Sequence, residues 1–134
     1  MRFIVPLLCA TLCFGQISSR PEFTNLVNQA VRNLEETHQE TNRILDQPGD
    51  TWTKQQQLTS VQNQAWSTMT MLLFDSDFNP TTEHETQLRQ DILAAYAQYN
   101  KYCRVQIRTN FSRPNDISYK AFERILSKLQ SSIR

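Results

Sequence analysis

The stretch RPEFTNLVNQAVRNLEETHQETNRILD, residues 20–46, carries the pattern that decides the fold. Its apolar residues recur at spacings of three and four, which predicts a helix with one apolar stripe. Ser19 and Glu22 form a capping-box pattern at its start, and Pro21 is tolerated in the first turn. Pro48 and Gly49 follow its end and cannot continue a helix. The stripe consists of Phe23, Leu26, Val27, Ala30, Leu34, His38, Thr41, Ile44 and Leu45.

Three further segments show the same periodicity. We expect a second helix from about Thr53 to the acidic turn at residues 75–79, a third from Thr82 to about Ile107, and a fourth from about Asp116 to the end. Short connections make neighbouring helices antiparallel. The sequence therefore predicts an all-α protein, an antiparallel up-down four-helix bundle or a similar small helical fold, with flattened or splayed variants left open. The later stripes are Leu58, Val61, Ala65, Met69, Leu72 and Leu73, then Leu88, Ile92, Ala95, Tyr96, Tyr99, Cys103 and Ile107, and finally Phe122, Ile125, Leu126, Leu129 and Ile133.

The first residues have the layout of a secretory signal peptide. Arg2 precedes an apolar run over residues 3–14, and Gly15 is the expected cleavage position. The run is too short to anchor the chain in a bilayer, so we expect no stable membrane insertion. The sequence thus predicts a signal peptide over residues 1–15, a single helical domain over residues 16–134, and a secreted, extracellular protein.

Removal of the signal peptide would leave Cys103 as the single cysteine, which excludes a disulfide framework. Cys103 continues the stripe of the third helix, so we expect a buried, free and unreactive thiol. The alternative is a disulfide-linked dimer of two copies through Cys103.

Charge is unevenly distributed along the chain. Residues 20–103 hold 6 basic and 11 acidic residues, whereas residues 104–134 hold 7 basic and 2 acidic residues. Two explanations are open. Helices of opposite net charge pack beside each other, or the basic end binds a partner through Lys120, Arg124 and Lys128. The basic residues lack interleaved aromatic or glycine motifs, which excludes nucleic acid as a partner.

The stretch LFDSDFNPTTEHE, residues 73–85, places Asp75, Asp77 and Asn79 at alternate positions, as in a calcium loop. Such a loop needs glycine at its sixth position and glutamate at its twelfth, where this chain has Pro80 and Thr86. A weaker divalent-cation site of Asp75, Asp77 and Asn79 stays open. The simpler interpretation is a turn, because these residue types favour turns and helix caps.

Other residues give few chemical signals. His38 and His84 are the only histidines, too few for a zinc site without further ligands. No nucleophile, base and orienting group can be assembled, so the sequence predicts no catalytic residue and no enzyme. Asn110 begins an N-glycosylation motif in a predicted loop. The aromatic residues could form core or line a cavity for an apolar ligand; they are Trp52, Trp66, Tyr96, Tyr99 and Tyr102.

The stretch NRILDQPGDTWTKQQQLTSVQNQAW resembles nematode SXP/RAL-type secreted proteins, in which an isoleucine and a short break precede a threonine-led helix rich in lysine and glutamine. The tail AFERILSKLQSSIR is similar to that family's closing helix. The resemblance implies a secreted helical protein with a cation-binding domain and without known enzymatic activity. The residues that carry it are Ile44, Leu45, Pro48, Thr53, Gln56, Gln57 and Trp66.

Two functions follow from these observations. The first is a secreted, non-enzymatic helical binding protein for an ion, a small apolar ligand or a protein surface. The alternative is a cytokine-like or effector bundle that binds an acidic receptor through Lys120, Arg124 and Lys128. The first needs no cofactor beyond a weakly held divalent cation.

Overall fold

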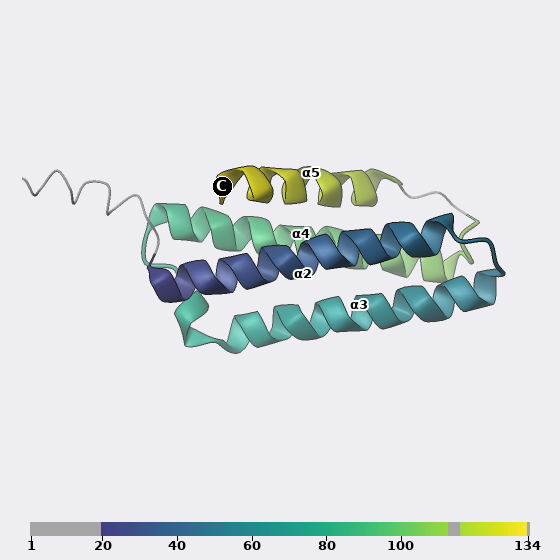
Figure 1. The fold of residues 1–134 in the computed structure, drawn as a ribbon, viewed down its shortest axis with the longest axis horizontal. Coiled ribbons are helices and arrows are strands. Elements are labelled where there is room, and N and C mark those ends of the chain that lie inside the picture. The colour runs from purple at the N-terminus through teal and green to yellow at the C-terminus, as the bar shows by residue number, and fades with distance from the viewer. Residues whose placement is uncertain (1–19, 113–115, 134) are drawn as a thin grey trace, which may run out of the picture.

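The computed structural model describes residues 20–112 and 116–133, and the expected signal peptide over residues 1–15 lies outside these ranges. The long helices of the described chain are α2 at Pro21–Asp46, α3 at Thr51–Phe74, α4 at Glu83–Arg108 and α5 at Asp116–Ser132. A short 3-10 helix, η1, spans Ser76–Phe78 between α3 and α4. Consecutive long helices run in opposite directions (Figure 1). The prediction of an all-α four-helix bundle is therefore confirmed.

The bundle is flattened. Helices α2 and α4 contact each other and form a central pair, and α3 and α5 each pack against both members of that pair. Figure 1 shows α3 and α5 on opposite sides of the pair. Each of these two flanking helices therefore has one face on the core and another face turned away from it.

Capping side chains fix where α3 and α4 begin. The Asp50 carboxylate accepts a hydrogen bond from the Thr53 amide at 2.7 Å, so α3 begins at Thr51, slightly before the predicted start. The Thr82 hydroxyl accepts a hydrogen bond from the Glu85 amide at 3.1 Å at the start of α4. Thr82 therefore caps α4 at the position from which the sequence predicts the third helix.

The core is richest in aromatic side chains where α2, α4 and α5 meet. The ring centroids of Tyr99 and Phe122 lie 5.2 Å apart, and those of Tyr102 and Tyr119 lie 4.6 Å apart. The Tyr99 hydroxyl and the Thr41 hydroxyl share a hydrogen bond of 2.6 Å. Because this buried hydroxyl has a partner, tyrosine can occupy the centre of the core at little cost.

Two residues that the stripes place inward are exposed instead, namely Leu73 and Ile133. Leu73 directly follows the buried Leu72, and adjacent residues of a helix point about 100° apart, so both cannot face the core. Conversely, Phe78 of η1 is buried and stacks on Phe23 of α2 with ring centroids 5.6 Å apart. The turn after α3 thus contributes a side chain to the core.

Candidate functional site

Helix α3 is unusual among the four helices because it is almost uncharged. Lys54 is its only charged residue, whereas α2 and α4 each carry seven charged residues. The Lys54 amine donates to the Leu45 carbonyl oxygen at 3.4 Å. The C-terminal part of α3, AWSTMTMLLF at residues 65–74, is apolar on more than one side, and it exposes Trp66, Met71 and Phe74. A helix with apolar residues around its circumference usually contacts something on each side.

An open groove of about 180 Å³ lies between α2 and the C-terminal part of α3. Four apolar residues from these two helices line it, and three polar residues border it. Pockets with apolar walls and a few polar groups are the usual sites for small apolar ligands. The apolar residues are Leu26, Ala30, Met71 and Leu72, and the polar residues are Gln29, Thr68 and Asp75.

The three candidate cation ligands belong to the turn after α3. Asp75 caps η1 through its carboxylate, which accepts a hydrogen bond from the Asp77 amide at 2.9 Å. The Asn79 backbone carbonyl accepts a hydrogen bond from the Arg20 guanidinium at 2.6 Å. Within residues 20–112 and 116–133, no three histidine, cysteine, aspartate or glutamate side chains gather in a way that could hold a metal ion. The turn interpretation therefore accounts for these contacts, and the cation site stays a prediction.

A buried carboxylate next to this turn was not predicted. Glu85 has no exposed side-chain surface, and its carboxylate accepts hydrogen bonds from the Arg20 backbone amide at 3.0 Å and the Thr81 amide at 2.9 Å. The Arg20 guanidinium pairs with it at 3.2 Å. Burial alone would raise the pKa of Glu85, but the amide and guanidinium hydrogen bonds lower it from 4.5 to about 2. This contact joins the start of α2 to the start of α4 and so fixes the turn beside the groove.

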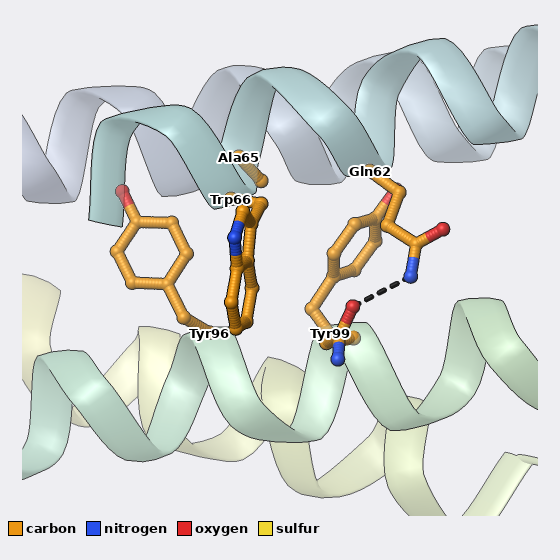
Figure 2. Close-up of a pocket in the computed structure, with 6 residues that line it drawn as sticks. Gln62, Ala65, Trp66, Tyr96 and Tyr99 are labelled. Carbon is orange, nitrogen blue, oxygen red and sulfur yellow. Dashed lines mark hydrogen bonds between the residues drawn. The ribbon is translucent and has the colours of Figure 1, made fainter. Parts of the chain in front are cut away.

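The cavity that the sequence leaves open as an alternative to an aromatic core is filled by side chains. Figure 2 shows the Trp66 indole between α3 and α4, near the rings of Tyr96 and Tyr99. The space that remains there is about 10 Å³. The Tyr96 hydroxyl donates to the Asn33 side chain at 2.6 Å. Tyr96, Tyr99 and Tyr102 are therefore core residues, and the room for a ligand lies in the groove between α2 and α3.

Cys103 is fully buried in α4, and its thiol is free. Burial raises the pKa of the Cys103 thiol to about 12, although a hydrogen bond with Tyr99 lowers it in part. A thiol with this pKa is protonated at neutral pH and reacts slowly. A disulfide between two copies would require the core around Cys103 to open, and that dimer stays a prediction.

Asn110 lies two residues after the end of α4 and is exposed, as a glycan acceptor must be. Its backbone has a φ of 54°, and its side-chain oxygen accepts a hydrogen bond from the Gln55 amide group at 2.5 Å.

The two histidines, which the sequence offers as metal ligands only with further partners, lie apart from the groove. His38 contacts Glu123 at 2.8 Å and stacks on Tyr119, whereas His84 is exposed.

The basic residues of α5 share one exposed side of the helix. Lys120, Arg124 and Lys128 follow one another at intervals of four residues, and all three are exposed. The Lys128 amine forms a salt bridge of 3.2 Å with Asp91 of α4. Part of this basic edge is therefore held against an acidic residue of the neighbouring helix, as expected for helices of opposite sign.

Comparisons with protein-family models, with curated proteins and with solved structures give no match. The resemblance to SXP/RAL-type proteins therefore stays a prediction. Among the helices of the described ranges, none has the length and apolar character needed to cross a membrane.

Proposed function

We propose that this chain is a secreted, non-enzymatic binding protein that holds a small apolar ligand in the groove between α2 and α3. The observation that carries the proposal is the open groove of about 180 Å³ with apolar walls. Leu26 and Ala30 of α2 face Met71 and Leu72 of α3 there. A short hydrocarbon chain in this space would remove apolar surface from water at about 25 cal/mol per Å².

The polar border of the groove indicates the chemistry of the ligand's other end. Gln29 and Thr68 offer hydrogen-bonding groups, and Asp75 adds a carboxylate. The Asp75 carboxylate would repel an anionic head group such as that of a fatty acid. We therefore expect a neutral ligand with an apolar body and a hydroxyl or amide group.

The probe that tests this proposal is 1-hexanol, which has an apolar chain and one hydroxyl. Saturation-transfer NMR should detect saturable binding to the unaltered chain. The Thr68→Phe variant fills the groove and should abolish the signal, whereas Ser127→Phe on the exposed side of α5 should retain it. Equal binding by both variants, or no binding by the unaltered chain, would contradict the proposal.

A second candidate function uses α5. Lys120, Arg124 and Lys128 lie on one exposed edge, which is suited to an acidic partner. In this case the chain acts as an effector or cytokine-like bundle, and replacing the three residues with glutamine abolishes partner binding. Under the groove proposal the same triple variant still binds 1-hexanol.

A further inference from the structure

We propose that two copies of this chain pair through the outer face of α3, in an antiparallel arrangement with two-fold symmetry. The outer face is the row of residues on the side of α3 turned away from its buried stripe. This row lies next to the groove and is a separate surface. It consists of Trp52, Gln56, Thr59, Asn63, Trp66, Ser67, Thr70 and Phe74.

The absence of charge on this face favours a second copy as the occupant. In a two-fold interface the same patch meets itself, so a charged patch would be repelled by its own copy. The outer face contains no Asp, Glu, Lys or Arg. The Lys54 side chain is not part of the face, and it contacts the Leu45 carbonyl oxygen near the end of α2. An acidic or basic partner would find no charge here to recognise.

One hydroxyl of the outer face already has a partner within the helix. The Thr70 hydroxyl donates to the Trp66 carbonyl oxygen at 2.9 Å. A hydroxyl that already has a partner loses less when water leaves the surface.

The order of residues along α3 suits an antiparallel pair. Asn63 lies midway between Trp52 and Phe74, so a two-fold axis at Asn63 places Trp52 of one copy against Phe74 of the other. The same axis places Thr59 against Ser67, and these small side chains let the two helices approach closely at the centre. The two Asn63 amides would meet on the axis, where each can both donate and accept a hydrogen bond.

The exposed aromatic surface of the face is large enough for such a pair. Its three aromatic side chains keep much of their surface exposed. At about 200 Å² for each of these side chains, their exposed parts amount to ~400 Å², about half of the ~800 Å² per partner of a standard interface, and apolar groups supply little more than half of a typical interface. The exposed fractions are 67% for Trp52, 53% for Trp66 and 87% for Phe74.

Sedimentation velocity over a micromolar to millimolar series, under reducing conditions, tests this dimer without interference from a Cys103 disulfide. The unaltered chain should form a dimer as its concentration rises. Trp52→Lys and Phe74→Glu should each weaken dimerisation at least tenfold. Ile117→Glu is a matched control, because it places a charge on an 80% exposed apolar residue of α5, and it should leave the dimer intact.

Mixing the two α3 variants tests the antiparallel arrangement itself. At one end of the mixed pair the introduced lysine would meet the introduced glutamate, and at the other end the unaltered Trp52 would still meet the unaltered Phe74. The mixture should therefore dimerise at concentrations where neither variant alone does. Circular dichroism of each variant should show an unchanged helix content.

Three outcomes would count against this pairing. A chain that stays monomeric throughout the series overturns the proposal. The proposal is also overturned if neither Trp52→Lys nor Phe74→Glu weakens the dimer. A mixture that remains monomeric overturns the antiparallel arrangement.

Discussion

Helices α3 and α5 flank the same central pair, but their outward surfaces differ in kind. α5 exposes basic side chains at Lys120 and Arg124, whereas α3 exposes aromatic side chains at Trp66 and Phe74 and carries almost no charge. Both helices pack an apolar stripe against the central pair. The inward stripes therefore explain the fold. The outward surfaces distinguish a charged helix, α5, from a nearly uncharged helix, α3, whose exposed apolar side chains are suited to an uncharged ligand or partner.

The largest expected effect is the loss of stability when a core aromatic residue is replaced, compared with the loss when a surface aromatic residue is replaced. Phe122→Ala on the inner side of α5 should lower the free energy of unfolding by about 3–5 kcal/mol, because the buried ring leaves a cavity. Phe74→Ala on α3 should change it by less than about 0.5 kcal/mol, because that ring is exposed. Urea unfolding at concentrations that keep the chain monomeric measures both. Equal losses would mean that Phe74 belongs to the core and that the contrast between α3 and α5 is wrong.

The stability of the fold should depend on the buried carboxylate of Glu85, which holds the turn after α3 in place. Glu85→Gln should lower the free energy of unfolding by about 2 kcal/mol at pH 7, because charge-assisted hydrogen bonds from Arg20 and Thr81 are weakened. The exposed Glu83→Gln in the same helical turn is the control.

The pH dependence of this contribution has a definite sign. The pKa of Glu85 is lowered in the folded state from 4.5 to about 2, so its contribution is present above pH 4.5 and is lost as pH falls toward 2. The difference between the unaltered chain and Glu85→Gln should shrink over this pH range in urea titrations. A difference that stays constant down to pH 2 would show that the Glu85 charge contributes nothing.

A smaller effect is expected for the basic edge of α5. Replacing Lys120, Arg124 and Lys128 with glutamine should change the free energy of unfolding by less than about 1 kcal/mol, since the Lys128 salt bridge with Asp91 is largely exposed on the lysine side. The affinity for 1-hexanol, measured by NMR titration, should stay the same. A loss of that affinity would mean that α5 takes part in ligand binding and that the two flanking helices do not differ in role.

The smallest effect is expected when a divalent cation is added, which tests the acidic turn at residues 75–79. Calcium or magnesium at millimolar concentration should leave the melting temperature unchanged, because the Asp75 carboxylate caps η1 and the Asn79 carbonyl oxygen holds Arg20. An ion that bound only the folded chain would raise the melting temperature. A rise of several degrees that disappears in Asp77→Asn would therefore restore the cation site of Asp75, Asp77 and Asn79.

Local sequence patterns predict the parts of this molecule that depend on local geometry. Spacings of three and four place Phe23 and Phe122 in the core, and the expected start of the third helix at Thr82 agrees with the observed cap of α4. Burial of Glu85 could not be predicted in this way, because its main partner Arg20 lies 65 residues earlier in the chain. The groove could not be predicted for the same reason, because its walls come from two helices, with Leu26 on α2 and Met71 on α3. The near absence of charge in α3 was the one available signal.

The most direct test of the binding role of α3 compares its two methionines. Met71 lines the groove and is exposed, whereas Met69 packs against the core from the same helix. Carbon-13 methyl NMR during titration with 1-hexanol should show a saturable shift of the Met71 signal and little change at Met69. If neither signal moves, or if both move together in proportion to the added alcohol, the groove does not bind the ligand and α3 has no such role.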